Sequence, residues 1–237
     1  MNNYLQVTDY VGVSFWLVSV AMVDATVFFL YEGMHAKSSW RISLLVAGLV
    51  TLIAAIHYYY MREYWVNSGE SPIVYRYIDW LLTVPLQMIE FYLILVAAGL
   101  AVSVVVFWKL LIGTLVMLLG GYFGEIGTID ASFGFVIGMA GWIYIIFEIF
   151  RGESSIVASK SETVKGAFKA LALIVVVGWS IYPIGYIFGL LTPMIGFGTI
   201  NINFLNITYN LADFINKILF GLIIWNASIR DRKINNN

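Results

Sequence analysis

The stretch Tyr209-Asn-Leu-Ala-Asp213-Phe-Ile-Asn-Lys217 places a lysine inside a long apolar segment near the end of the chain. That segment runs from Asn206 to Ile229, and about 20 apolar residues are enough to span a bilayer. Lys217 lies near its middle, where a charged side chain is unfavourable by about 3 kcal/mol on insertion scales. Asp213 precedes Lys217 by one helical turn, so both side chains lie on the same helix face.

A buried lysine with an acidic partner has two interpretations. It is either a structural ion pair or a reactive amine, because buried lysines form Schiff bases with carbonyl compounds. The motif alone favours neither, and the rest of the chain has to decide between them.

The composition indicates an integral membrane protein. Of 237 residues, 61% are hydrophobic and 11% are charged, whereas a soluble domain has roughly 25% charged residues. The absence of cysteine excludes disulfides and cysteine metal sites, and two histidines leave little material for any other metal site, so we expect no metal. The net charge of −1 says nothing about partners; we expect a lipid bilayer and no nucleic acid.

Apolar segments separated by mostly short connections predict seven membrane-spanning helices. They cover roughly residues 10–31, 40–62, 73–97, 105–124, 131–150, 167–190 and 205–229. We find no internal repeat and expect one all-α domain, a seven-helix bundle over residues 1–237. The turn Ser68-Gly-Glu-Ser-Pro72 places a proline at the first position of the third helix. In the longest connection, at about 191–204, the alternation from Thr199 to Phe204 predicts a small hairpin.

Basic residues gather on one side of the predicted bundle. Ten of the 13 lysines and arginines lie on this side, in or beside the connections after the first, third and fifth spans and in the C-terminal tail: Lys37, Arg41, Lys109, Arg151, Lys160, Lys165, Lys169, Arg230, Arg232 and Lys233. The other side has only Arg62 and Arg76, near helix ends. By the positive-inside rule the N-terminus is outside and the C-terminus is cytoplasmic. Seven spans place the two termini on opposite sides of the membrane, which agrees with this orientation.

The third span carries ionisable residues along one face. Asp79 and Glu90 are eleven residues apart, which is three helical turns and about 16 Å along the axis. Arg76 lies one turn outward of Asp79, and Thr83 lies one turn inward. Intramembrane ionisable residues are functional candidates, so this face predicts a ladder of proton-binding groups. The alternative is a structural salt bridge between Arg76 and Asp79, with Glu90 simply buried.

The sixth span carries an aromatic stripe. Trp179, Tyr182, Pro183 and Tyr186 follow helical spacing, and the proline predicts a bend. Such a stripe more often belongs to core packing than to a ligand site. Beside Lys217, however, it is able to line a binding site for a flat conjugated ligand.

At this point the chain resembles a known family, the microbial rhodopsins, and among them the proteorhodopsins. The resemblance covers all seven spans, and its motifs are most specific in the third and seventh. The matching stretches are Tyr10-Val-Gly-Val-Ser-Phe-Trp16, His57-Tyr-Tyr-Tyr-Met-Arg62, Arg76 to Pro85, Glu90-Phe-Tyr-Leu-Ile-Leu95, Trp179 to Tyr186, and Tyr209 to Trp225.

The resemblance implies a light-driven outward proton pump, a transporter rather than an enzyme, in the bacterial inner membrane. It implies all-trans-retinal bound covalently to Lys217 as a protonated Schiff base. Asp79 would be counterion and proton acceptor, Asp213 the second counterion and Glu90 the cytoplasmic proton donor. Arg76 would tune the counterion region, and His57 would pair with Asp79. The pocket would contain Trp80, Thr83, Gln87, Met117, Gly121, Phe135, Trp179, Tyr182, Pro183, Tyr186 and Asn216.

Two finer expectations follow from the same resemblance. In the family, glutamine at the position of Gln87 marks blue-absorbing members and leucine marks green-absorbing members, so we expect a blue-absorbing pigment. Family members form rings, so we expect a homo-oligomer, a pentamer or hexamer, with Trp16 near His57 of the adjacent chain.

Other functions stay open at this stage. A photosensor that signals through a partner protein is the main alternative, and Glu90 argues against it because a sensor needs no internal proton donor. A pump for another ion and a seven-span transporter or receptor without chromophore are further alternatives. Two residues depart from the family pattern: we expect Asp24 to be a hydrogen-bonded interior carboxyl and Glu125 to lie at the pocket edge or exit.

Overall fold

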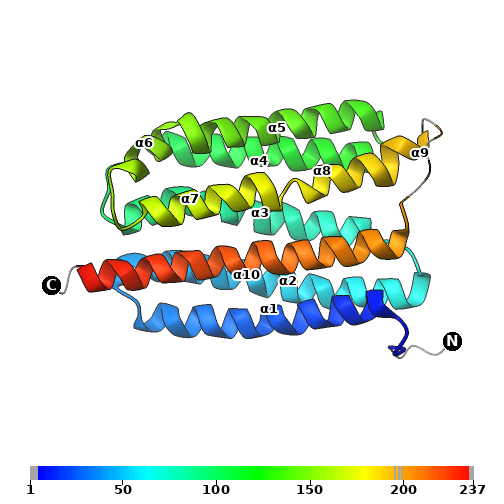
Figure 1. The fold of residues 1–237 in the computed structure, drawn as a ribbon, viewed down its shortest axis with the longest axis horizontal. Coiled ribbons are helices and arrows are strands. Elements are labelled where there is room, and N and C mark those ends of the chain that lie inside the picture. The colour runs from blue at the N-terminus through cyan, green and yellow to red at the C-terminus, as the bar shows by residue number, and fades with distance from the viewer. Residues whose placement is uncertain (1–4, 195, 197, 199, 235–237) are drawn as a thin grey trace.

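Seven long helices lie side by side in the computed structural model, which describes residues 5–194, 196, 198 and 200–234. Among the described residues, seven helices are long and apolar enough to cross a membrane, and none forms a strand. Figure 1 shows the start of α1 and the end of α10 at opposite ends of the bundle. The elements are α1 Tyr10–His35, η1 Ser38–Trp40, α2 Arg41–Ser68, α3 Ile73–Ala97, α4 Val104–Glu125, α5 Ala131–Arg151, α6 Glu153–Ser159, α7 Lys165–Leu173, η2 Ile174–Gly178, α8 Ile181–Tyr186, η3 Ile187–Leu191, α9 Thr192–Met194 and α10 Ile202–Ile234.

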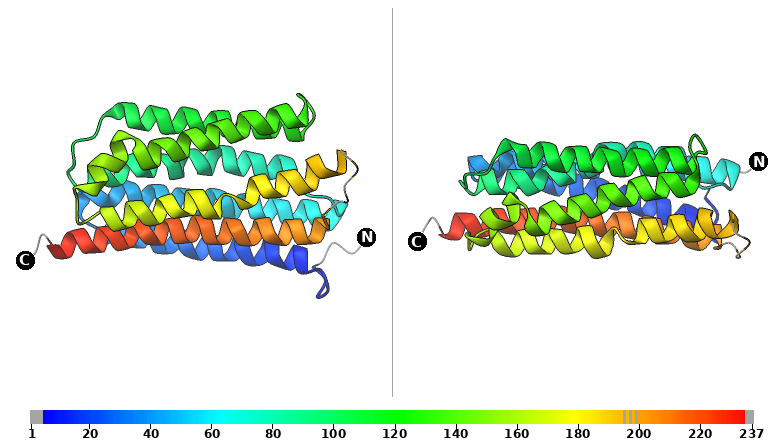
Figure 2. Two further views of the ribbon diagram at one scale, coloured as in Figure 1. Left: turned by 45° about the horizontal axis from the view of Figure 1, so that its top comes forward. Right: turned by 90° about the horizontal axis from the view of Figure 1, so that it is seen from above.

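The helices form a closed ring around a common interior. α1 packs against α2, α2 against α3, α3 against α4, and α4 against α5. α10 contacts α1, α2, α7 and α8, and α5 contacts α7 and α8, which closes the ring (Figure 2). The sixth span is therefore held between α5 and α10, and its inner face lies opposite α3.

The seven predicted spans are confirmed, with several helices longer than predicted. α2 continues from 62 to Ser68, α10 begins at Ile202, and the short α6 follows α5. An apolar window marks the part of a helix that lies in lipid, whereas backbone hydrogen bonds continue into the polar flanks. Gly69 ends α2 in the left-handed conformation with φ 70°, and Pro72 is the N-cap of α3, one position earlier than predicted.

The predicted hairpin between the sixth and seventh spans is wrong. Ile202, Asn203 and Phe204 form the first turn of α10, while Thr199 lies outside the described residues. The Asn201 side chain accepts the N–H of Asn203 at 2.8 Å and that of Phe204 at 3.3 Å. Asparagine is a favourable N-cap because it satisfies free N–H groups of the first turn, so this residue starts a helix where its polarity suggested a turn.

The sixth span is bent, as its proline predicted. Two π-helical segments, Ile174–Gly178 and Ile187–Leu191, flank α8, and Figure 1 shows the break between α7 and α8. Pro183 has no N–H to continue the α-helical hydrogen-bond pattern. The Tyr182 N–H instead donates to the Trp179 carbonyl at 3.2 Å.

Asp24 does not lie in the interior, so the prediction of an interior carboxyl is wrong. Its side chain is exposed on the outer face of α1, beside Val20 and Val27, which are 43% and 63% exposed. The inner face of α1 is formed by residues such as Met22 and Thr26. Met22 and Thr26 are each two residues from Asp24. At about 100° per residue this is a rotation of about 200°, so the carboxyl lies on the opposite side of the helix.

Replacing Asp24 with leucine should therefore make membrane insertion of the first span more favourable by about 3 kcal/mol, the difference between the two side chains at a helix centre. A glycosylation-site insertion assay on this span measures the effect. The neighbouring substitution Val23→Leu is the control and should change insertion little. Equal insertion of Asp24→Leu and the wild type would contradict the position of this carboxyl within the membrane.

Candidate functional site

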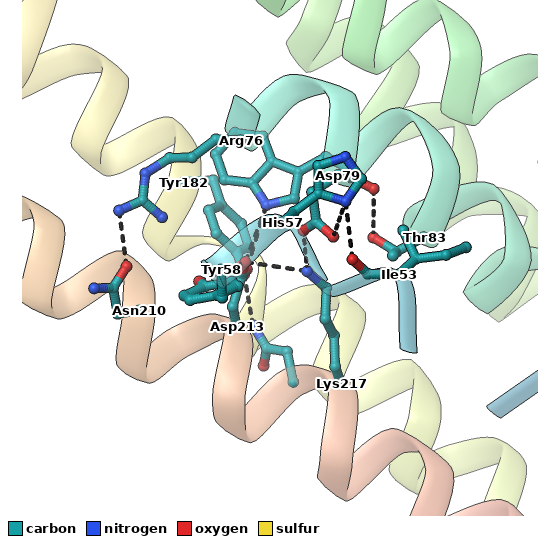
Figure 3. A network of polar contacts seen from close by, with 12 residues as sticks. Ile53, His57, Tyr58, Arg76, Asp79, Thr83, Tyr182, Asn210, Asp213 and Lys217 are labelled. Atoms are coloured by element: carbon teal, nitrogen blue, oxygen red, sulfur yellow. Dashed lines mark hydrogen bonds and ion pairs between the residues drawn. The ribbon is translucent and has the colours of Figure 1, made fainter. Parts of the chain in front are cut away.

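The ammonium group of Lys217 lies between two carboxylates in the interior of the bundle. Nζ donates to Asp213 Oδ2 at 3.1 Å within α10 and to Asp79 Oδ2 on α3 (Figure 3). All three residues are at most 3% exposed. Helical spacing predicted the contact between Lys217 and Asp213. The contact between Lys217 and Asp79 depends on the packing of α3 beside α10. A buried cation held by two carboxylates leaves one negative charge in excess.

Asp213 is held by hydrogen bonds from three aromatic side chains. The Tyr58 hydroxyl donates to Oδ2 at 2.8 Å, the Tyr182 hydroxyl donates to Oδ1, and Trp80 Nε1 lies 3.3 Å from both oxygens. These donors come from α2, α8 and α3. Hydrogen bonds to the charged form stabilise a carboxylate, so this arrangement favours an ionised Asp213.

Asp79 is held much less firmly. Its Oδ2 contacts Lys217, but its Oδ1 makes no hydrogen bond with the described residues. His57 Nδ1 lies 4.0 Å from this Oδ1 and 2.8 Å from the Ile53 carbonyl. Because a carbonyl only accepts, Nδ1 carries the proton. The structure thus places His57 beside Asp79 as a nearby dipole or charge, with its hydrogen bond directed to the α2 backbone.

Arg76 bonds to asparagines instead of an acid. Its Nη2 donates to Asn206 Oδ1 at 2.9 Å and to Asn210 Oδ1 at 2.8 Å. The guanidinium also lies over the rings of Phe15 and Tyr209, 5.2 and 5.4 Å from their centroids. The Arg76–Asp79 salt bridge, the structural alternative for this face, is absent among the described residues. The two asparagines were missed because amides in a helix carry no distinctive sequence signal.

Glu90 is separate from this cluster but lies on the same helix. Its side chain is 1% exposed, and neither carboxyl oxygen makes a hydrogen bond with the described residues. Ser43 on α2 is the polar side chain that faces it. The next residue along α3, Phe91, is also buried, and its ring contacts those of Phe168 and Phe220. The predicted ladder on α3 therefore has two buried carboxyls with different surroundings.

A cavity extends from Lys217 between α3, α4, α5 and the sixth span. Eleven of the predicted pocket residues line it: Trp80, Gln87, Met117, Gly121, Phe135, Trp179, Tyr182, Pro183, Tyr186, Asn216 and Lys217. Glu125 lines it as well, as expected for a residue at the pocket edge. At Gly121 a Cβ atom would lie 3.1 Å from the Tyr77 hydroxyl, so glycine leaves space in the α4 wall.

Thr83 was predicted in the pocket but does not line the cavity. Its hydroxyl donates to the Asp79 carbonyl at 2.9 Å, one turn back along α3. The lining residues of this helix are instead Trp80, Val84 and Gln87, which form a stripe at spacings of four and three residues. Thr83 lies beside this stripe, is fully buried and has its hydroxyl bonded to the α3 backbone.

Several lining residues were not predicted. They are Tyr77, Val84, Leu118, Gly138, Met139, Trp142 and Tyr209. A signal was present on α5, where Phe135, Met139 and Trp142 have the i, i+4, i+7 spacing of one helix face. It resembled ordinary core packing, and only the contact with the sixth span turns this face into a cavity wall.

The cavity fits a flat, largely apolar molecule joined to the amine of Lys217. Aromatic rings form its walls: Trp80 and Tyr182 have centroids 5.0 Å apart at 65°. Charged side chains are few in its lining: Lys217 and Asp213 are ion-paired on α10, and Glu125 lies on α4. Such a lining matches a ligand site with few polar groups. An aldehyde beside Lys217 is able to condense with Nζ with release of water, and the two carboxylates would stabilise a positively charged imine.

Comparison with known proteins identifies relatives over nearly the whole chain. A family model described as bacteriorhodopsin-like protein matches residues 9–230. A blue-light absorbing proteorhodopsin of Gamma-proteobacterium Hot 75m4 is 53% identical over 96% of this chain and 89% of its own. A green-light absorbing proteorhodopsin of Gamma-proteobacterium EBAC31A08 is 51% identical over 96% of this chain and 90% of its own.

A solved structure gives the same result for the fold. The crystal structure of a blue light-absorbing proteorhodopsin from Med12 matches with a TM-score of 0.79 at 52% identity, over 94% of this chain and all of that one. With the seven apolar helices, these matches make the protein a multi-pass membrane protein. The chain belongs to the bacteriorhodopsin-like protein family.

Proposed function

We propose that this protein is a light-driven outward proton pump that absorbs blue light, with all-trans-retinal attached to Lys217 as a protonated Schiff base. The observation that carries the proposal is the position of Lys217 Nζ between Asp79 and Asp213 at the end of an aromatic cavity. The similarity to two proteorhodopsins, at 53% and 51% identity, supports it.

Bound retinal supplies light absorption and an isomerisation that displaces the nitrogen of Lys217 and changes its affinity for a proton. Asp79 is the acceptor because its Oδ1 has no hydrogen bond with the described residues and is open to a proton. Asp213 keeps its charge as second counterion because three side chains donate to it. His57, 4.0 Å from Asp79, influences when that carboxyl accepts.

Glu90 returns the proton from the cytoplasmic side. An apolar environment favours the neutral form of a carboxyl, and Glu90 is buried without a charged partner among the described residues. It lies three turns from Asp79, about 16 Å along α3. A neutral acid on one side of Lys217 and an ionised carboxylate on the other give the transfer its direction.

Arg76 keeps a positive charge on the opposite side of the cluster from Glu90. Two asparagine oxygens and two aromatic rings hold it there. A fixed cation near the outer end of the bundle stabilises the ionised form of nearby carboxylates. Its positive charge also repels a released proton, which favours release to the outside.

The direction of transport depends on the orientation in the membrane. Basic residues concentrate at the helix ends that include Lys37, Arg151 and Arg232. By the positive-inside rule this end is cytoplasmic and the start of α1 is outside. The inner membrane of a bacterium is the corresponding location.

A photosensor that signals through a partner protein is less supported. The buried Glu90 on the face of Asp79 gives the chain a proton donor that a sensor does not need. Light-induced acidification of a suspension of cells that express the protein tests the proposal. We expect acidification that disappears with a protonophore and with Asp79→Asn; no pH change, or alkalinisation, would overturn it.

Lys217→Ala should abolish the visible absorption band that forms on addition of retinal, because no other amine lines the cavity among the described residues. Absorption spectra of the purified variant measure this. Trp142→Phe, which changes a wall but keeps the amine, is the control and should retain colour. A retinal-dependent visible band in Lys217→Ala would exclude Lys217 as the attachment site.

Glu90→Gln should keep the colour but slow the return of the proton to the nitrogen of Lys217, by a factor of about 100 or more for loss of a positioned proton donor. Flash spectroscopy at neutral pH follows the decay of the deprotonated species. Added azide, a small diffusible acid, should restore the rate. An unchanged decay would remove Glu90 from the mechanism.

Gln87→Leu should shift the absorption maximum to longer wavelength. Gln87 is 2% exposed and lines the cavity, and its amide dipole stabilises the ground and excited charge distributions unequally. Spectra of both proteins are compared at one alkaline pH, so that Asp79 is ionised in each. No shift, or a shift to shorter wavelength, would contradict a tuning role.

The protein should assemble as a pentamer or hexamer with Trp16 near His57 of the adjacent chain. Trp16 is 43% exposed on α1, and its ring lies 6.0 Å from Tyr59 and 5.9 Å from the Arg62 guanidinium. An exposed aromatic residue beside arginine is typical of interface hot spots. Native mass spectrometry in mild detergent measures the assembly; Trp16→Ala should weaken it, and monomers alone in the wild type would contradict it.

A further inference from the structure

The side chain of Asn216 connects α10 to the interrupted sixth span. Its Nδ2 donates to the Gly178 carbonyl at 3.1 Å and lies 3.3 Å from the Tyr182 hydroxyl. Asn216 is 4% exposed and directly precedes Lys217. The residue beside the reactive amine is therefore bonded to the part of the molecule that bends.

The Gly178 carbonyl needs this donor because of Pro183. In an α-helix the N–H of Tyr182 would donate to the Gly178 carbonyl, four residues earlier. Since Pro183 has no N–H for the Trp179 carbonyl, Tyr182 donates there instead at 3.2 Å. An unpaired carbonyl in a membrane interior is unfavourable, and the Asn216 amide supplies the missing hydrogen bond.

Glycine at 178 is also required by the close approach of Asn216. A Cβ atom at this position would lie 2.1 Å from Asn216 Oδ1 and 2.9 Å from its Cγ. Such distances are far shorter than van der Waals contact, so any side chain at 178 would displace the amide. The two residues fit only as a pair.

Gln87 bonds to the backbone of the same asparagine. Its Nε2 donates to the Asn216 carbonyl at 3.3 Å, and a carbonyl has two lone pairs to accept this bond besides one within the helix. The Asn216 carbonyl belongs to the peptide that joins Asn216 to Lys217. Three parts of the bundle, namely α3, η2 and α10, thus meet at one residue.

We propose that Asn216 is a positioning residue that links the Gln87 amide and the bend of the sixth span to Lys217, and that Gln87 sets colour mainly through this peptide, in addition to the direct effect of its dipole. The orientation of the Asn216–Lys217 peptide determines where the Lys217 side chain begins, and hence its separation from Asp79. The interaction energy of a carboxylate with a cation varies inversely with their separation, so a small displacement changes the absorption maximum. This proposal rests on the proposed function in that colour requires retinal at Lys217.

The link itself is testable without retinal, because the chain contains one Asn–Lys dipeptide, Asn216–Lys217. Labelling asparagine with ¹³C at the carbonyl and lysine with ¹⁵N gives one solid-state NMR signal for this peptide. Gln87→Leu should move the carbonyl resonance in the retinal-free protein. Val84→Ala, which alters the same wall of the cavity without a hydrogen bond, should leave it in place. An unmoved resonance in Gln87→Leu would overturn the link.

The effect on colour is tested by a double-mutant cycle in retinal-loaded protein. Asn216→Ala keeps the backbone carbonyl that Gln87 binds but removes the side-chain amide that holds this peptide against Gly178. If Gln87 acts through a peptide held in this way, the shift caused by Gln87→Leu should fall to less than about half in the Asn216→Ala background, because coupled residues are not additive. Additive shifts would overturn the proposal. A wild-type protein that binds no retinal would overturn the proposed function and the colour effect with it, whereas the carbonyl resonance still tests the link.

Gly178→Ala provides a second approach to the same contact. The new methyl group should displace the Asn216 amide, shift the absorption maximum and move the labelled carbonyl resonance. Adding Asn216→Ala removes the clash, so the double variant should have the colour of Asn216→Ala alone. A colour and resonance unchanged by Gly178→Ala would overturn the role of this contact.

Discussion

A buried ammonium group among carboxylates is the interaction on which the rest of the interior depends. Lys217 is 3% exposed, and a lone charge at this depth would be strongly destabilising. Asp213, on the same helix, and Asp79, on α3, balance it. This requirement brings α3 and α10 together near the middle of the bundle, and α2 and α8 follow because they supply the tyrosines that satisfy Asp213.

The two carboxylates beside Lys217 differ in a way that suits transport. Asp213 accepts hydrogen bonds from Tyr58, Tyr182 and Trp80, and its environment leaves little capacity for a proton. Asp79 has one oxygen without such a bond to any residue that the structure describes. An acceptor has to change its protonation during each cycle, whereas a structural counterion has to stay charged. Asp79 and Asp213 have the same charge, so it is the number of hydrogen bonds each accepts that distinguishes the proton acceptor from the permanent counterion.

The bend in the sixth span connects this polar centre to the cavity. Pro183 disrupts the backbone hydrogen bonds, and the aromatic residues around it line the space next to Lys217. The Asn216 amide satisfies the carbonyl that the bend exposes. A regular helix at this position would leave the amide without this partner, so the interruption is part of the site's architecture.

The sequence by itself determined the seven spans, the pairing of Asp213 with Lys217 and the shared face of Asp79 and Glu90. Apolar windows and helical spacing are local properties, which explains why these predictions agree with the structure. Only tertiary packing decided which helix face turns inward. It placed Asp24 on the outer surface, left Thr83 out of the cavity lining, made the α5 face a wall and gave Arg76 asparagine partners. Those outcomes depend on neighbouring helices, and spacing along one helix contains no information about its neighbours.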